Sequence, residues 1–165
     1  MAMPNRSPRP ISLAEQRKRR NRVARLAKTF GFTGRVEYRH VYSQSGGAQY
    51  CRATEESKDL LAVYAEGFER DDKPDDFSLT AIVAHERGHQ LLARHPRIAK
   101  QVGSRISLAS EEILASLLGA ILCPAGEDRE ALIAKATVEL VNHGATLQTS
   151  TRRLQELWNL MEALL

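Results

Sequence analysis

The chain has 165 residues, of which 42% are hydrophobic and 27% charged, so it can bury one domain-sized core and is not expected to be disordered. No run of about 18 apolar residues is present, and the first ten residues lack the apolar core of a signal peptide, which excludes a membrane span and disfavours secretion. Two cysteines, Cys51 and Cys123, are too few for a disulfide scaffold or a cysteine-only zinc site, so we expect a cytoplasmic protein.

The net charge of +4 is unevenly distributed along the chain. Residues 1–28 contain nine Lys or Arg and one acid, Glu15, whereas residues 29–165 contain fifteen basic and nineteen acidic residues. A basic segment such as residues 6–28 is typical of contact with nucleic acid or with an acidic partner. Its commoner explanation is the solvated face of a helix, and both interpretations stay open.

Taken in chain order, the first half predicts one helix and a small sheet. Residues 1–10 are expected to form a flexible leader, and a helix is expected to begin after Ser12 and to end at Gly31. Residues 34–42 and 48–53 alternate in the manner of strands, and Gly46-Gly47 between them indicates a hairpin. A third strand is predicted over 59–68, followed by an exposed loop over 69–76.

The second half of the chain has a helical pattern throughout. A helix is predicted over 76–95, where Pro96 would end it, and further helices over 109–123, 127–142 and 150–165. The predicted fold class is therefore α+β, with a small, mostly antiparallel three-stranded sheet packed on a helical bundle. Residues 11–165 are expected to form a single domain.

The segment His85-Glu86-Arg87-Gly88-His89 is an HExxH motif inside the predicted helix 76–95. Residues four apart on a helix are about 40° apart, so His85 and His89 can reach one ion. Zn²⁺ accepts two imidazoles and a carboxylate and leaves a fourth position for water. Glu86 projects to the side, where it can take a proton from that water as the general base. Arg87 and Arg94 are predicted on the opposite, solvent-facing side of the helix.

A third protein ligand is required, and the sequence offers three candidates. His95 has the spacing of the metzincin third histidine, but Leu92 occupies the position where that motif needs a glycine. Glu111 and Glu112 lie on the next helix. Glu112 shares a face with small residues, which permits close helix approach, and it is the favoured ligand; Glu111 shares a face with leucines and stays an alternative. The small residues are Ser116, Gly119 and Cys123.

The run HERGHQLL followed by SEEILASLLGAILCP resembles the gluzincin pattern, an HExxH motif with a glutamate on a following helix. It is most similar to ImmA/IrrE-type metallopeptidases and to the peptidase-like domain of ArdC-type antirestriction proteins, over about residues 59–124. The resemblance implies a zincin-like core, His85, His89 and Glu112 as zinc ligands and Glu86 as general base. It also implies that Ser116 supports a ligand histidine.

The resulting hypothesis is a zinc metallopeptidase that hydrolyses a specific intracellular protein or peptide, with zinc as its cofactor. The strand predicted over 59–68 is expected to pair with an extended substrate. Tyr38, Tyr50 and His143 are candidate donors to the oxyanion, and Cys51 is either a half-buried strand residue or a blocking ligand. The alternative is a catalytically silent zinc-binding regulatory module whose basic helix contacts nucleic acid or an acidic partner.

Overall fold

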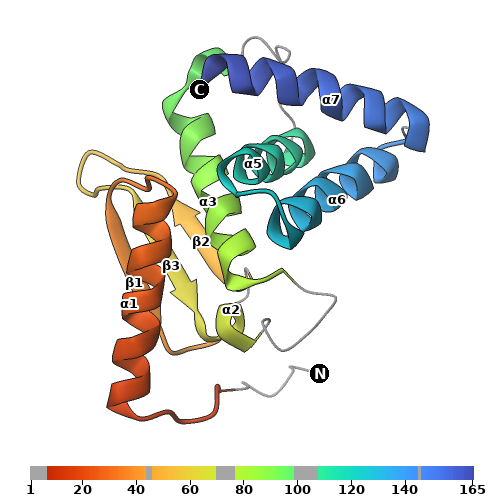
Figure 1. The fold of residues 1–165 in the computed structure, drawn as a ribbon. Helices are drawn as coiled ribbons and strands as arrows, with labels where there is room; N and C mark the ends of the chain where they lie inside the picture. Colours follow the sequence, from red (N-terminus) through yellow and green to blue (C-terminus); the bar gives the residue numbers. More distant parts are fainter. Residues whose placement is uncertain (1–6, 44–45, 70–76, 99–107, 145) are drawn as a thin grey trace, which may run out of the picture.

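The architecture consists of a small sheet, two long helices laid on one of its faces, a short helix after the last strand and a group of three further helices (Figure 1). The computed structural model describes residues 7–43, 46–69, 77–98, 108–144 and 146–165. Residues 1–6 of the predicted leader and residues 70–76 of the predicted loop lie outside the described residues. The α+β class predicted from sequence is confirmed.

The sheet is mixed, and its strand order corrects the predicted hairpin. Strands β1 (Arg35–Arg39), β2 (Ala48–Cys51) and β3 (Leu60–Tyr64) are arranged in the order β1-β3-β2. β3 runs parallel to β1 and antiparallel to β2, so β1 and β2 do not pair and the prediction of a mostly antiparallel sheet is wrong. The amino-acid composition of the strands explains this order. β3 is a continuous apolar run, LLAVY, which suits the centre of the sheet. β1 and β2, with the sequences RVEYR and AQYC, carry polar residues, which are tolerated at the edges.

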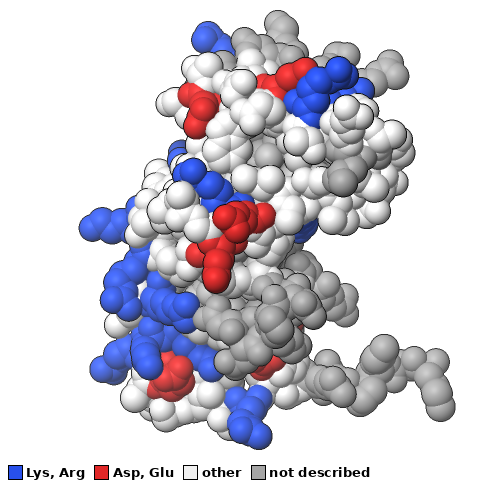
Figure 2. Space-filling view, turned by 45° about the vertical axis from the view of Figure 1, so that its right-hand side comes forward, with Lys and Arg blue, Asp and Glu red and all other residues white. Residues whose placement is uncertain are grey.

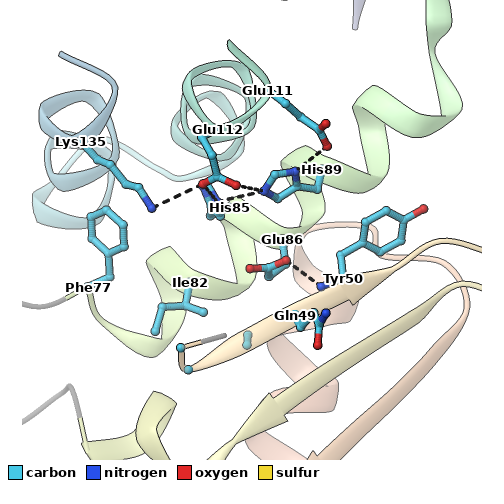
Figure 3. A pocket seen from close by; sticks show the side chains of 13 residues that line it. Gln49, Tyr50, Phe77, Ile82, His85, Glu86, His89, Glu111, Glu112 and Lys135 are labelled. Carbon is cyan, nitrogen blue, oxygen red and sulfur yellow. Dashed lines mark hydrogen bonds and ion pairs between the residues drawn. The ribbon is translucent and has the colours of Figure 1, made fainter. Parts of the chain in front are cut away.

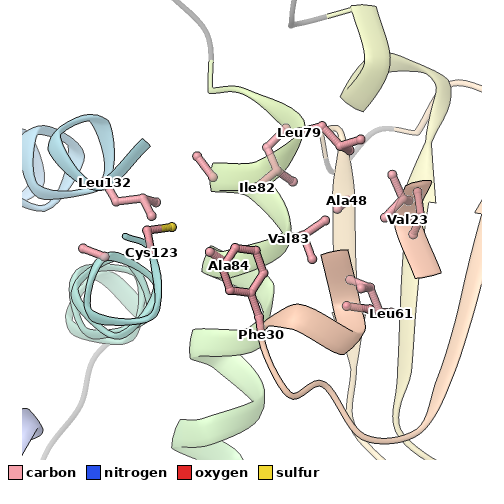
Figure 4. Close-up of a cluster of buried hydrophobic side chains, with 14 residues drawn as sticks. Val23, Phe30, Ala48, Leu61, Leu79, Ile82, Val83, Ala84, Cys123 and Leu132 are labelled. Atoms are coloured by element: carbon pink, nitrogen blue, oxygen red, sulfur yellow. The ribbon is translucent and has the colours of Figure 1, made fainter. Parts of the chain in front are cut away.

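Helices α1 (Leu13–Thr29) and α3 (Leu79–Arg94) cover the same face of the sheet. The side chains of Ser12 and Ser78 cap their first turns by accepting hydrogen bonds from the amides of Glu15 and Ala81. Figure 4 shows α3 between two apolar layers, with Leu61 and the helix α1 on one side and Cys123 and Leu132 on the other. α3 is consequently the central helix of the core, which fixes the position of the HExxH motif that it carries.

The remaining helices are α2 (Ala65–Glu69), α5 (Leu108–Leu122), α6 (Glu127–Asn142) and α7 (Leu147–Leu164). α2 occupies the second half of the strand predicted over 59–68, because strand pairing ends at Tyr64. α5, α6 and α7 pack with the C-terminal half of α3 around a second apolar cluster that includes Leu91, Leu114 and Met161. None of the described helices is long and apolar enough to cross a bilayer.

A buried carboxylate, Asp59, ties the start of β3 to β2 and α3. Its Oδ1 accepts hydrogen bonds from the amide of Ala53 at 2.7 Å and from the hydroxyl of Tyr50 at 3.1 Å. Its Oδ2 accepts from the buried side chain of Gln90 at 2.7 Å and from Arg94 at 2.8 Å. Burial raises the pKa of Asp59, but these hydrogen bonds outweigh burial, and the net shift is downward.

The two arginines of α3, predicted on the solvent-facing side of the helix, both make polar contacts within the protein. Arg94 binds buried Asp59, and half-buried Arg87 donates to the carbonyl of Phe30. Desolvation lowers the pKa of Arg87. Arg94 is exposed, as the sequence pattern predicts, although its guanidinium also binds Asp59. Arg87 is half-buried, so the prediction that it faces solvent is wrong.

We expect Asp59→Asn to lower the free energy of unfolding by about 2 kcal/mol at pH 7, because charge-assisted hydrogen bonds to a buried group are lost. The pKa of Asp59 is lower in the folded protein than in the unfolded chain, where it is about 3.9. Ionised Asp59 therefore stabilises the fold fully above this unfolded pKa, and the stabilisation is lost as the pH falls through the folded-state pKa. Urea unfolding of the wild type, Asp59→Asn and the exposed control Glu55→Gln should show a difference that is constant above about pH 5 and shrinks below about pH 4. A variant as stable as the wild type at pH 7 would contradict this assignment.

Candidate metal centre

The two histidines of the HExxH motif project from one face of α3, as their spacing predicts. The Nε2 atoms of His85 and His89 are 3.1 Å apart, and their rings lie edge to face. His85 is buried and His89 is half-buried at the wall of a pocket. One turn of a core helix thus presents two nitrogen donors to the same point in space.

Helix α5 approaches α3 closely because small residues line the contact. A Cβ atom added to Gly88 would lie 2.2 Å from the carbonyl oxygen of Ala115, and one added to Gly119 would lie 2.9 Å from the backbone of Ala84. Neither position has room for any side chain, so the two backbones touch. This contact brings the first turns of α5, with Glu111 and Glu112, over the histidines.

Glu112 completes a group of three possible metal ligands with His85 and His89. Its Oε2 lies 3.2 Å from the Nε2 of His85, and its Oε1 lies 3.1 Å from the Nε2 of His89 (Figure 3). In a tetrahedral site with metal–nitrogen distances of 2.0–2.1 Å, neighbouring ligand atoms are about 3.3 Å apart. The three residues therefore supply the donor set of a tetrahedral His₂Glu site, and their ligand atoms all lie within 4.8 Å of one another.

The outer nitrogen of each histidine also has a partner. The Nδ1 of His85 lies 3.1 Å from the hydroxyl of Ser116, the contact that the family resemblance implied. The Nδ1 of His89 lies 3.1 Å from Oε1 of Glu111, so Glu111 lies behind the histidine and outside the group of three. The ionised carboxylate of Glu111 can only accept, so this contact favours a protonated Nδ1 on His89 and leaves its Nε2 free to bind a metal. The hydroxyl of Ser116 has the same effect on His85 when it accepts a hydrogen bond from Nδ1.

The carboxylates dominate the electrostatics of this group. Hydrogen bonds from His85 and His89 hold the pKa of Glu112 well below its usual range. Burial lowers the pKa of His89, but the hydrogen bond to Glu112, the charge of Glu86 and the hydrogen bond to Glu111 outweigh burial and raise it. The lowered pKa keeps Glu112 ionised, and a divalent cation can neutralise the negative charge that it carries.

Glu86 faces the same pocket from the next position of α3. Its Oε2 accepts a hydrogen bond of 2.7 Å from the backbone amide of Tyr50 on β2. Figure 3 shows the Glu86 carboxylate between the histidines and the strand. The buried carboxylate is therefore held beside the three donors without joining them, as a proton acceptor for a bound water would be.

The pocket has a volume of about 490 Å³ and contains residues that sequence reasoning did not identify. The most notable is Lys135 of α6, whose Nζ lies 3.7 Å from Oε2 of Glu112 and 5.1 Å from the ring centre of Phe77. Its neighbours Leu132 and Ala136 are buried, so the pattern places Lys135 at the edge of an apolar face. Nothing in the sequence says which helix that face meets. The segment Gly46–Tyr50 lines the pocket on the side of β2.

Other sequence candidates lie elsewhere or are engaged in other contacts. His95 is exposed at the C-cap of α3 and is not part of the ligand group. Tyr38 and His143 are absent from the described lining of the pocket, and the hydroxyl of Tyr38 binds Arg19 and His40. Tyr50 lines the pocket, but its hydroxyl donates to Asp59, and burial followed by the Asp59 charge raises its pKa to about 12.

Cys51 is half-buried on β2 and belongs neither to the ligand group nor to the described lining. This is the ordinary strand position expected of it, and it does not block the histidines.

Comparison with protein-family models, with curated proteins and with solved structures finds no match. The interpretation of the site therefore depends on its geometry and chemistry.

We expect Glu111 and Glu112 to affect zinc binding to different degrees. Glu111→Gln removes an outer partner of His89 and should weaken binding roughly ten- to a hundredfold, whereas Glu112→Gln removes a ligand and should weaken it by a larger factor. Competition with a chromophoric chelator measures both affinities. The reverse order would make Glu111 the ligand, and wild-type affinity in Glu112→Gln would remove Glu112 from the site.

Proposed function

We propose that the chain is a zinc-dependent metallopeptidase of the gluzincin type, with His85, His89 and Glu112 as the metal ligands. The observation that carries this proposal is the meeting of these three donors, all within 4.8 Å of one another, in a pocket that also contains Glu86. Two imidazoles and one carboxylate are the donor set of zinc peptidases that keep one position open. The zincin-like core implied by the family resemblance is part of the same proposal.

When bound, zinc would lower the pKa of a water molecule towards about 7 and polarise the carbonyl of a peptide bond. Glu86 accepts the proton of the attacking water and passes it to the leaving amine. The amide of Tyr50, 2.7 Å from the carboxylate, holds Glu86 in place for this transfer. Lys135 supplies a positive charge at the pocket wall, where it favours the oxygen on which negative charge develops.

An extended peptide substrate is expected to bind along β2. The strand predicted for this role from sequence, 59–68, contains β3, whose two edges are occupied by β1 and β2, so that assignment is wrong. Among the described residues β2 pairs only with β3, and the segment Gly47–Tyr50 lines the pocket beside Glu86. Main-chain pairing to a free strand edge gives affinity without demanding a particular side-chain sequence. A specific intracellular protein is the proposed substrate, with the cytoplasm as its compartment.

The second candidate function is a zinc-binding regulatory module without turnover. In this alternative the basic helix contacts nucleic acid or an acidic partner; the ligand group is the same, and at the metal site the two functions differ only in whether Glu86 acts as a base. The two functions are therefore separated by one substitution that leaves the ligands intact.

We expect Glu86→Gln to bind zinc within a few-fold of the wild-type affinity and to lose peptidase activity by about 10²–10⁴, because glutamine keeps the shape of glutamate but cannot accept the proton. Cleavage of a proteome-derived peptide mixture, followed by mass spectrometry, measures activity on many sequences at once and so requires no chosen substrate. Glu55→Gln, an exposed glutamate outside the pocket, is the matched control. Zinc-loaded wild type that leaves every peptide intact would contradict the peptidase proposal and favour the regulatory module.

A further inference from the structure

The outer face of α1 is a continuous basic surface. At 100° per residue, Arg17, Lys18, Arg25 and Lys28 fall within an arc of about 100° that lies opposite the buried residues Val23 and Ala27. All four cations are exposed, and none of them makes an ion pair with a described residue. In Figure 2 the Lys and Arg side chains crowd the left-hand edge of the lower half, where α1 lies in Figure 1.

The charge of this face is not neutralised within the helix. α1 contains one acid, Glu15, and its carboxylate bonds Arg19 at 3.2 Å on the side of the helix that meets β1. Arg19 itself is part-buried against Tyr38 and Phe68. The helix therefore uses Glu15 and Arg19 for packing and leaves the four outer cations available to a partner.

Small side chains separate the cations and let a partner come close. A shallow hollow along the outer face is lined by Ala14, Arg17, Lys18, Asn21, Ala24 and Arg25. From Ala14 to Lys28 the surface extends about 21 Å along the helix axis, enough to meet several consecutive phosphates. Positive charge beside a hollow without bulky groups suits a charged polymer backbone.

The same features argue against the other anionic partners. A membrane-binding helix needs a free apolar face, but that of α1 is buried in the core through Val23, Ala27 and Phe30. A protein interface needs large apolar or aromatic anchors and disfavours lysine. The face offers only Leu13, which is 81% exposed at its N-terminal end. The binding of phosphates requires neither a free apolar face nor apolar anchors.

We propose that the outer face of α1, formed by Arg17, Lys18, Arg25 and Lys28, binds the phosphate backbone of nucleic acid without sequence preference. The proposal is independent of the metal centre, since none of these residues lines the pocket of His85 and His89. It assigns a nucleic-acid surface to the basic segment for which the sequence alone left two explanations open.

The test is fluorescence anisotropy with a labelled 24-base-pair duplex of mixed sequence at 50–200 mM salt. If four phosphates are contacted, the slope of log affinity against log salt is about −3.6, and affinity falls about a hundredfold over this range. The variant Arg17→Gln/Lys18→Gln/Arg25→Gln/Lys28→Gln should bind more than tenfold more weakly at 50 mM, with a flatter slope. The control Arg52→Gln/Lys58→Gln/Arg152→Gln/Arg153→Gln loses the same charge from exposed positions outside α1 and should bind as the wild type does.

Three results would overturn the proposal. The first is that the wild type does not bind the duplex at 50 mM salt, and the second is that the two quadruple variants lose equal affinity. The third is that the quadruple α1 variant binds the duplex normally but loses affinity for poly-glutamate. The last would assign the surface to an acidic protein. Unchanged melting temperatures verify that both variants are folded, and unchanged zinc affinity keeps this test separate from that of the peptidase.

Discussion

The structure depends on the close packing of α3 against α5. Gly88 lies within the HExxH motif itself and faces the backbone of Ala115, while Gly119 faces Ala84. Because no side chain separates the helices at these two points, Glu112 reaches the Nε2 atoms of both histidines at 3.1–3.2 Å. Had either glycine been any larger residue, the helices would be forced apart and the third donor would move out of range of the first two.

The surroundings of this contact give each donor its orientation. Ser116 and Glu111 lie at the outer nitrogens of His85 and His89, and Lys135 lies on the far side of Glu112. On the opposite side of α3, Gln90 and Arg94 are bound to Asp59, which also holds Tyr50. The amide of Tyr50 in turn holds Glu86, so a chain of hydrogen bonds connects the buried carboxylate to the proposed general base.

Local patterns in the sequence predicted much of this arrangement. The capping residue Ser12 and the terminating residue Gly31 predicted the two ends of α1, and the helix predicted over 127–142 coincides with α6. The four-residue spacing predicted that His85 and His89 lie on one face of a helix. The stripe of small residues on α5 predicted the close approach that favours Glu112 over Glu111. Each of these signals lies within one element or on one face of a helix, where periodicity and capping determine the outcome.

Errors arose where the outcome depended on distant parts of the chain. Gly46-Gly47 suggested a hairpin, but the more apolar β3 takes the place between β1 and β2 because it is buried more fully than either. The bond from Arg94 to Asp59 was missed because Asp59 is 35 residues earlier in the chain. Lys135 was missed because only the packing of α6 against α5 brings it to Glu112.

The most direct test of the central claim is X-ray absorption spectroscopy at the zinc edge of the purified, zinc-loaded protein. We expect four nitrogen or oxygen neighbours at about 2.0 Å, two of them imidazoles, and no sulfur. A shell at about 2.3 Å would place Cys51 or Cys123 on the metal, and six oxygen neighbours without imidazole would indicate adventitious binding. Either result would contradict a site built from His85, His89 and Glu112.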